Sequence, residues 1–461
     1  MRYLSTRDTS KTFEFKDVFI KGLADDGGLF IPETVAKYGE NEIRDLKKLS
    51  YSELAKKIVY PFIGNFMSES EMSKIIDKSY STFRKDNVVD FIKIGDKTIL
   101  ELFHGPTLAF KDVAMQLLGN FYEYYLNNQN QKINIVVATS GDTGAAAIDA
   151  IKGKKNVNIF VLHPDNRVSP VQRKLMTTGK HENVFNIAIK GNFDDCQNLV
   201  KSMFADKQFS NDIKMSGVNS INWARIIAQS VYYFYSYLLV ENTGQLTNFS
   251  VPTGNFGDIY AGYIAKQMGL PIEKLIIATN ENDILRRVVN TGLYKPTKVK
   301  PSLSPSMDIQ VSSNFERLLF NILNSDKRVK QTMHSLKDKG YFKLDNKSKN
   351  KIKKDFAAFK TSNQDTKKII NAIFSKYKIF LDPHTATGFN AARQLKSNYP
   401  TVILGTAHPY KFIETMRNAT GKIIKRPSNL SKSSSLKEKY DIIANNTNLI
   451  KKYILDKQYE N

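Results

Sequence analysis

The sequence predicts an α/β protein in which helices cover parallel β-sheets. From Thr98 onward, short β-branched runs alternate with helix-length stretches, and this alternation is typical of parallel sheets. Three of the runs lead directly into small-residue turns that open helices. The chain has 461 residues, and at roughly 100–200 residues per domain this length predicts two or three domains.

The N-terminal part of the chain, residues 1–95, is expected to form a mainly helical domain. Helical patterns cover residues 50–63 and 70–82, and a glycine-containing turn, LADDGGLFIP, lies at residues 23–32. Apolar residues three and four positions apart predict helices that bury one face.

Six apolar runs are predicted as strands: residues 133–138, 157–162, 184–189, 249–251, 275–278 and 402–404. The first, fourth and sixth runs end in the turns TSGDTGAA, PTGNFGDIYAGY and LGTAHPYKF. Ligands of open α/β sheets bind at the carboxyl ends of the strands. One cleft lined by these turns is therefore expected.

The chain is strongly basic, with 68 Lys+Arg against 45 Asp+Glu and a net charge of +23. Residues 327–378 hold 16 Lys/Arg and four Asp. In this segment Phe356, Phe359, Ile369, Ile370 and Ile373 stand at helical spacing, which predicts amphipathic helices whose lysines face solvent. No helix-turn-helix, zinc-finger or RNP signature is found, so no nucleic-acid partner is expected.

Cysteine content and hydropathy predict a cytoplasmic protein with no membrane segment. Cys196 is the single cysteine, which excludes a disulfide framework and a cysteine-based metal site. The polar start MRYLSTRDTSKTFEF lacks the apolar core of a secretory signal. The apolar runs are strand-length, far below the roughly 20 residues of a spanning helix.

A glycine-containing turn at residues 254–258, GNFGD, follows one predicted strand and precedes a helix. Backbone N–H groups at such a junction can hold a phosphate. A purely structural strand-to-helix junction is about equally common. The turn matches neither the dinucleotide-binding nor the Walker pattern.

A second turn, SGDTG at residues 140–144, offers two hydroxyl groups and a carboxylate at another helix start. Such a turn suits a carboxylate or phosphate ligand. Taken alone, a routine helix cap by Ser140 or Asp142 is the more common arrangement.

A third segment, HGPTLAFKD at residues 104–112, places Lys111 after small and apolar residues at the edge of a predicted helix. Burial would favour the neutral, nucleophilic form of an amine. Taken alone, a lysine in this position is more often a surface lysine whose stem lies along the protein.

In their order along the chain, HGPTLAFKD, TSGDTGAA, PTGNFGDIYAGY and LGTAHPYKF resemble the motifs of threonine synthases, pyridoxal-phosphate enzymes of the tryptophan-synthase-β fold type (fold type II). LADDGGLFIP, NSINWARI at residues 219–226 and SPSMDIQVSSNFERLLF at residues 304–320 resemble the longer bacterial and fungal subgroup. The resemblance extends from about Tyr3 to Lys422.

The resemblance implies two parallel-sheet α/β domains and a mainly helical N-terminal domain. We expect an N-terminal domain at residues 1–95 and a smaller domain with the cofactor-binding lysine at residues 96–215. A larger domain with the phosphate-binding turn is expected at residues 216–425, and a C-terminal helix or tail at residues 426–461.

The resemblance also implies a cofactor site for pyridoxal 5'-phosphate. Lys111 would hold the cofactor covalently and move protons at Cα and Cβ of the substrate. The backbone N–H groups of the turn would bind the cofactor phosphate, and the residues concerned are Gly254, Asn255, Phe256, Gly257 and Asp258. Thr406 would face the pyridine nitrogen. Asp142 would lie near the phenolic oxygen, where a carboxylate is repelled, so we expect it to accept from backbone donors or from the proton of the lysine link.

The implied substrate is O-phospho-L-homoserine. Ser140 and Thr143 would bind its α-carboxylate, and Arg225, with Asn222 nearby, is the candidate for its phosphate, although an arginine on a helix is as often a surface ion pair. Capping or packing is expected for His104 and His408 rather than acid–base chemistry. The chain is expected to act as a monomer or homodimer.

The implied reaction is a β,γ-replacement that converts O-phospho-L-homoserine and water to L-threonine and phosphate, the last step of threonine biosynthesis. The alternative is a related pyridoxal-phosphate enzyme, either a serine/threonine dehydratase or a phospho-lyase that stops after elimination. Both would share Lys111 and the glycine-containing turn. In another class, the basic chain could bind nucleic acid.

Overall fold

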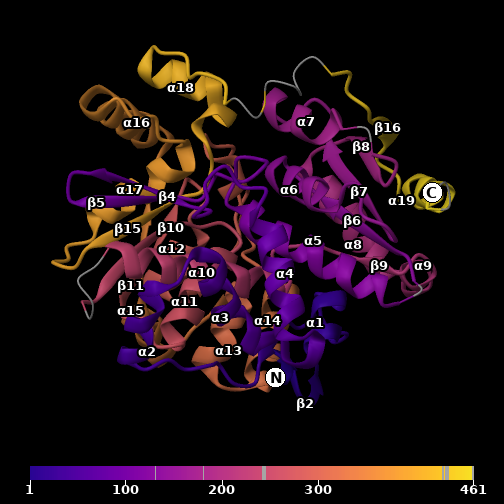
Figure 1. The fold of residues 1–461 in the computed structure, drawn as a ribbon, viewed down its shortest axis with the longest axis horizontal. Helices are drawn as coiled ribbons and strands as arrows, with labels where there is room; N and C mark the ends of the chain where they lie inside the picture. Colours follow the sequence, from indigo (N-terminus) through magenta and orange to yellow (C-terminus); the bar gives the residue numbers. More distant parts are fainter. Residues whose placement is uncertain (130, 180, 241–244, 428–429, 431–435, 459–461) are drawn as a thin grey trace. The chain divides into compact units, whose positions relative to one another are not determined.

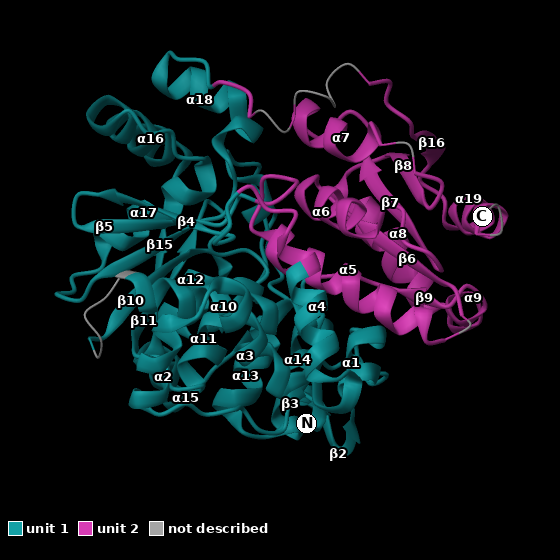
Figure 2. Cartoon of the chain, in the orientation of Figure 1, with its two compact units in different colours: residues 1–77, 85–104, 220–424 teal, residues 78–84, 105–219, 425–461 magenta. Residues whose placement is uncertain are grey.

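The computed structural model describes residues 1–461 except 130, 180, 241–244, 428–429, 431–435 and 459–461 (Figure 1). The chain forms two compact units (Figure 2). Unit 1 contains residues 1–77, 85–104 and 220–424, and unit 2 contains residues 78–84, 105–219 and 425–461. Each unit is built on its own sheet, which is mainly parallel in unit 1 and all-parallel in unit 2.

The main sheet of unit 1 has six strands in the order β14-β11-β10-β15-β5-β4. The strands are β4 (Asp90–Ile94), β5 (Lys97–Glu101), β10 (Thr247–Pro252), β11 (Ile272–Thr279), β14 (Phe356–Lys360) and β15 (Thr401–Gly405). All neighbours are parallel except β4, which pairs antiparallel with β5. β10 and β15 therefore end at the same edge of the sheet.

The helices of unit 1 that follow residue 220 are α10 (Trp223–Val240), α11 (Gly257–Gln267), α12 (Ile284–Thr291), α13 (Phe315–Leu323), α14 (Asp326–Lys339), α15 (Asn346–Asp355), α16 (Asn363–Tyr377), α17 (Pro383–Gln394) and α18 (Ile413–Thr420). A two-stranded ribbon joins β12 (Leu293–Tyr294) to β13 (Phe342–Lys343). Ile370 of α16 and Met416 of α18 pack with Ile403 of β15 in one apolar cluster.

The helical interpretation of residues 327–378 is correct for most of the segment and wrong at one place. Ile369, Ile370 and Ile373 lie on the buried face of α16. Phe356 and Phe359, however, lie on strand β14, which pairs with β11. Two residues three positions apart share a helix face but lie on opposite faces of a strand. The spacing of these two phenylalanines alone therefore did not distinguish a helix from a strand.

The N-terminal part of unit 1 contains α1 (Phe15–Lys21), α2 (Glu40–Asp45) and α3 (Tyr51–Ile63), and α4 (Glu69–Tyr80) runs from unit 1 into unit 2. The predicted helix at residues 50–63 begins with a capping box in which Ser50 N–H donates to Glu53 Oε2 at 2.8 Å. A small antiparallel sheet of β1 (Tyr3–Ser5), β2 (Asp8–Phe13) and β3 (Phe30–Pro32) was not predicted.

The chain passes from one compact unit to the other after residues 77, 84, 104, 219 and 424, and residues 1–77 group with residues 220–424. The contacts within unit 1 explain this grouping, since Asn222 Nδ2 donates to the Phe19 carbonyl at 2.8 Å. The predicted domain borders near residues 95, 215 and 425 concern parts of the chain that would fold independently. These borders stay a prediction.

Unit 2 contains an all-parallel sheet in the order β16-β8-β7-β6-β9. Its strands are β6 (Ile133–Ala138), β7 (Val157–Pro164), β8 (Val184–Lys190), β9 (Met215–Ser216) and β16 (Asp441–Ala444). Its helices are α5 (Lys111–Asn127), α6 (Asp142–Ile151), α7 (Pro170–Thr177), α8 (Phe193–Ala205), α9 (Lys207–Asp212) and α19 (Thr447–Lys457). All six strands predicted in the two units are present.

One face of the unit 2 sheet is covered by α8 and α19. Leu199 of α8 and Ile450 of α19 pack in one cluster with Val136 and Phe160. Side chains alternate along a strand, so Ile135 and Val137 face the opposite side. The predicted C-terminal helix is α19. The Lys/Ser/Asn-rich stretch before it, residues 426–439, lies partly outside the described residues.

No helix within the described ranges is long and apolar enough to cross a membrane.

Candidate active site

The predicted site residues follow strand ends in both units. In unit 2, Lys111 opens α5 and residues 140–143 follow β6. In unit 1, the turn at residues 254–258 follows β10, and Thr406 follows the neighbouring parallel strand β15.

Lys111 is the first residue of α5, and its side chain is only 12% exposed. Its Nζ lies 3.6 Å from Asp142 Oδ2 and 4.8 Å from the centre of the Phe110 ring. The side chain is therefore held inside unit 2 rather than extended along the surface. An amine placed between an aromatic ring and a carboxylate has a defined position, as a covalent catalyst requires.

The loop before Lys111 is shaped by the buried carboxylate of Asp112. This carboxylate accepts hydrogen bonds from Thr107 N–H at 2.8 Å and from Thr107 Oγ1 at 2.6 Å. A Cβ on Gly105 would lie 2.4 Å from the Asp112 Cβ. The close approach explains the glycine in HGPTLAFKD, and the loop fixes where α5 and its lysine begin.

Asp142 is held by a residue that the sequence analysis did not single out. Gln172 Nε2 on α7 donates to Asp142 Oδ1 at 2.7 Å. The orientation of this amide is set because Gln172 Oε1 accepts from Ser169 Oγ at 2.8 Å. We predicted that Asp142 bonds backbone donors or the lysine link. The structure adds the Gln172 amide, which keeps the carboxylate beside Lys111.

Thr139, rather than Ser140 or Asp142, supplies the cap at the start of α6. Its Oγ1 accepts from Gly141 N–H at 2.9 Å and from Gly144 N–H at 2.8 Å. The hydroxyl groups of Ser140 and Thr143 make no hydrogen bond to any described residue. Both residues are half-buried and flank Asp142 at the helix start, so they stay available to a ligand.

We expect Gly141→Ala to lower the free energy of unfolding and to weaken cofactor retention. Gly141 has φ +135°, and an added Cβ would lie 2.8 Å from Gln172 Cδ. The backbone strain costs of order 1–3 kcal/mol, and displacement of Gln172 adds typically 1–3 kcal/mol.

The matched control is Gly340→Ala, because Gly340 has φ +76° and nothing within 4 Å of the added Cβ. It should show the backbone cost alone and retain the cofactor. Denaturant unfolding and cofactor absorbance check both variants, and equal losses of stability and cofactor would contradict the assignment to Gln172.

In unit 1, the turn at residues 254–258 turns its carbonyl groups toward its own scaffold. Ser312 Oγ donates to the Gly254 carbonyl at 2.7 Å, and Asn314 Nδ2 donates to the Asn255 carbonyl at 3.0 Å. Within the described residues, the backbone N–H groups of positions 254–257 have no acceptor. Several free donors at the start of a helix form a site for an anion.

The conformation of Phe256 is strained, and packing maintains it. Its φ of 65° is unusual for a residue with a side chain. The ring is 1% exposed and packs edge-on against Phe315 and beside Phe356, with centroid distances of 5.4 and 5.7 Å. Backbone strain of this kind is often found at functional sites.

The carboxylate of Asp258 is bonded by two tyrosines of α10. Its Oδ1 accepts from Tyr232 at 2.5 Å and from Tyr233 at 3.0 Å. Burial, with this carboxylate beside the two phenols, raises the pKa of both tyrosines well above the usual value. The phenols therefore remain donors, and Asp258 can contribute to a phosphate site only through its backbone.

The two residues suggested for the substrate phosphate differ in their contacts. Asn222 donates to the Phe19 carbonyl at 2.8 Å and accepts from Ala224 N–H at 3.1 Å, so its side chain joins the N-terminal segment to α10. Arg225 is 3% exposed rather than a surface residue. Burial lowers the pKa of Arg225 to about 10, so the guanidinium is charged at neutral pH.

The two histidines have structural contacts. His408 Nδ1 accepts from Tyr410 N–H at 3.1 Å and so caps the short turn after Thr406, as predicted. A ring nitrogen of His104 lies 2.9 Å from Glu101 Oε2, and the His104 ring packs beside Phe103. Thr406 is 5% exposed and directly follows β15.

Comparison with known proteins gives consistent matches along the chain. Family profiles described as "Threonine synthase N terminus", "Pyridoxal-phosphate dependent enzyme" and "Threonine synthase, C-terminal" match residues 2–80, 100–406 and 385–454. Threonine synthases of Pseudomonas aeruginosa and Saccharomyces cerevisiae are each 44% identical to the chain, across 96% of it and 96% and 95% of their own lengths. The chain belongs to the threonine synthase family.

Comparison with solved structures gives the same family. The pyridoxal-phosphate-bound threonine synthase of Brucella melitensis is 44% identical with a TM-score of 0.96 and full coverage of both chains. The yeast enzyme gives 42% identity and a TM-score of 0.94, with 100% of this chain and 99% of the other covered. The predicted fold, threonine synthase function and pyridoxal 5'-phosphate cofactor are confirmed.

The residues of both units fit the cofactor of the threonine synthase family. In unit 1, N–H groups at positions 254–257 offer donors for a phosphate, while their carbonyls are bonded elsewhere. In unit 2, Lys111 offers a buried amine. The individual roles of these residues stay predictions, which the experiments below test.

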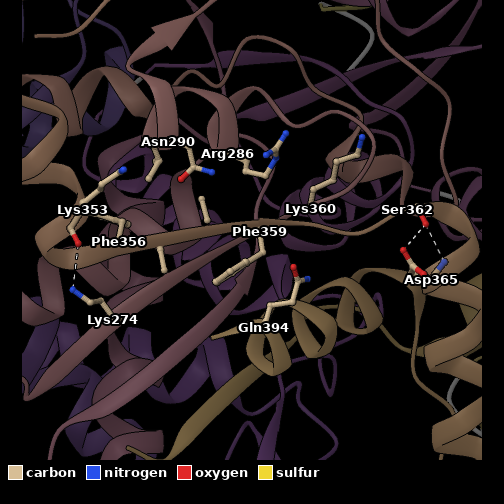
Figure 3. Close-up of a pocket in the computed structure, with 13 residues that line it drawn as sticks. Lys274, Arg286, Asn290, Lys353, Phe356, Phe359, Lys360, Ser362, Asp365 and Gln394 are labelled. Atoms are coloured by element: carbon tan, nitrogen blue, oxygen red, sulfur yellow. Dashed lines mark hydrogen bonds between the residues drawn. The ribbon is translucent and has the colours of Figure 1, made fainter. Parts of the chain in front are cut away.

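A pocket along edge strand β14 contains none of the predicted site residues (Figure 3). Two of its cationic side chains have partners of their own. Lys274 Nζ donates to the Lys354 carbonyl at 2.5 Å, and Arg286 pairs with Asp283 at 2.5 Å. This pocket is therefore distinct from the site that the threonine synthase motifs define.

Proposed function

We propose that the chain converts O-phospho-L-homoserine and water to L-threonine and phosphate. The observation that carries the proposal is the buried amine of Lys111, held 3.6 Å from Asp142 in a loop shaped by Asp112. The family match over nearly the whole chain supports the same reaction.

Lys111 would hold the cofactor covalently until the substrate amine displaces it, and the freed Lys111 amine would then act as the base. When bound, pyridoxal phosphate withdraws electrons from the substrate Cα and makes its proton acidic. The Lys111 amine would remove the Cα proton and then a Cβ proton. The C–O bond at Cγ breaks and phosphate leaves with the bonding electrons. A proton is then added at Cγ, water adds at Cβ, and Lys111 returns a proton to Cα.

Other residues would bind the two ends of the substrate. The hydroxyl groups of Ser140 and Thr143 at the start of α6 suit an α-carboxylate, because anions are favoured at a helix N-terminus. The buried guanidinium of Arg225 suits the substrate phosphate, because its planar donors match phosphate oxygens. Asn222 would act mainly by fixing the start of α10.

Thr406 would meet the pyridine nitrogen with a neutral hydroxyl. A neutral partner would not hold that nitrogen protonated, unlike a carboxylate, and this tempers the electron withdrawal. The backbone N–H groups of Gly254, Asn255, Phe256 and Gly257, with that of Asp258, would bind the cofactor phosphate.

A product assay tests the proposal against a lyase that stops after elimination. The purified holoenzyme is incubated with O-phospho-L-homoserine, and phosphate, threonine and 2-oxobutanoate are measured together. Equal amounts of threonine and phosphate are expected. Phosphate with 2-oxobutanoate and no threonine would show that the reaction ends before water adds at Cβ.

We also propose a cytoplasmic location and a monomeric or homodimeric enzyme. The single cysteine, Cys196, is buried, and burial raises the pKa of its thiol to about 12. A chain without disulfides suits a reducing compartment. Light scattering coupled to size-exclusion chromatography measures the assembly, and a species larger than a dimer would contradict the second part.

A further inference from the structure

Arg317 on α13 is a fully buried cation that bonds three oxygens of unit 1. Nε donates to the Phe30 carbonyl at 2.9 Å, Nη2 donates to the Ile221 carbonyl at 2.6 Å, and Nη1 donates to Asn314 Oδ1. Its guanidinium also lies 5.6 Å from the Trp223 ring centre. These oxygens belong to β3, to the segment before α10 and to the start of α13.

The bond to Asn314 determines which way that side chain faces. A guanidinium has only donors, so Arg317 requires the Asn314 oxygen and leaves the Asn314 nitrogen for other partners. Asn314 Nδ2 donates to the Asn255 carbonyl at 3.0 Å and to the Ser220 carbonyl at 3.2 Å. The Asn314 backbone N–H also donates to the Asn255 carbonyl, at 3.1 Å.

We propose that Arg317 is a positioning residue for cofactor binding, acting through the side-chain amide of Asn314 on the turn at residues 254–257. The assignment rests on the proposed function, in which the N–H groups of this turn bind the cofactor phosphate. Asn314 holds the Asn255 carbonyl on the scaffold side of the turn, which aims the N–H groups of the turn at the ligand. The same two residues fix Ser220 and Ile221, just before the helix that carries Arg225.

The neighbouring residue Glu316 provides a matched control on the same helix. Its carboxylate accepts from Thr6 Oγ1 at 2.7 Å and from Arg7 Nε at 2.8 Å. It therefore ties the N-terminal segment to α13, as Arg317 does through Phe30, and its carboxylate bonds Thr6 and Arg7 rather than the turn. Glu316→Gln reports what loosening the N-terminal segment alone does.

Asn314→Asp is the most selective variant. An aspartate keeps the shape of the side chain, still accepts from Arg317 and is equally good at the start of a helix. It cannot donate to the Asn255 and Ser220 carbonyls. Arg317→Met removes the buried cation itself and leaves its three partner oxygens unsatisfied.

The test measures the dissociation constant of pyridoxal 5'-phosphate for each apoenzyme by absorbance titration, together with the melting temperature. We expect Asn314→Asp to raise the dissociation constant of the cofactor about tenfold or more. This is the loss expected when a hydrogen bond that holds the binding turn of a charged ligand is removed. Glu316→Gln should bind the cofactor as wild type does.

Arg317→Met should weaken cofactor binding at least as much as Asn314→Asp. If it does not fold, Asn314→Asp alone decides the matter. Wild-type affinity in Asn314→Asp would overturn the proposal, and so would an equal loss in Glu316→Gln. A wild-type chain that binds no pyridoxal phosphate would instead refute the proposed function, and this assignment with it.

Discussion

Replacing Lys111 by alanine should lower kcat for threonine formation by about 10³-fold or more. General base catalysis alone contributes typically 10²–10⁴-fold, and the same amine would also hold the cofactor covalently. The variant should also lose the absorbance band of the lysine-bound cofactor. Threonine and phosphate are measured under saturating substrate, with the cofactor added in excess.

Lys155→Ala is the control for Lys111, since Lys155 is an exposed lysine in the same unit. It should keep both the absorbance band and the activity. A Lys111→Ala protein that retains the band, or that forms threonine within tenfold of the wild-type rate, would show that another amine does the chemistry.

Replacing Arg225 by glutamine should lower kcat/KM for O-phospho-L-homoserine by roughly 10- to 150-fold. A hydrogen bond to a charged group contributes about 1.5–3 kcal/mol, and most of this loss should appear in KM because the phosphate is bound before the reaction. Arg225→Lys should recover part of the affinity by keeping the charge. Steady-state kinetics with each variant give the two constants.

The pH dependence gives a second test of Arg225. Its pKa is lowered to about 10 by burial, so the cation is present below this pH and is lost as the pH rises through it. KM should therefore rise above about pH 10 in the wild type, and this rise should be absent in Arg225→Gln. Arg393→Gln, an exposed position on α17, is the control. An unchanged KM in Arg225→Gln would move the phosphate site elsewhere.

The sequence predicted the parts of the fold that depend on local patterns. The strand at residues 133–138 agrees with β6 at both ends, because a buried parallel strand is a continuous apolar run. The glycine turn after β10 was found for a similar reason, since close approach of the backbone requires small residues. The helix predicted for Phe356 and Phe359 shows the limit of local patterns. These residues lie on β14, which becomes a strand by pairing with β11, far away in the chain.

The side chains that orient the site were harder to predict. Gln172 meets Asp142 across 30 positions, and Arg317 meets Phe30 across 287. Neither residue carries a local signature of its role, and glutamine and arginine are most often exposed. The placement of Asn222 near the substrate phosphate stays a prediction. The structure shows that its amide holds the Phe19 carbonyl, a contact that needs the folded chain.

The reaction in water labelled with a heavy oxygen isotope tests the central claim most directly. If the C–O bond at Cγ breaks and water adds at Cβ, the label enters the hydroxyl group of threonine and the released phosphate stays unlabelled. We expect this result from the holoenzyme, with labelled threonine formed about 10³-fold more slowly, or slower still, by Lys111→Ala. Label in the phosphate, or release of unlabelled threonine, would contradict the β,γ-replacement.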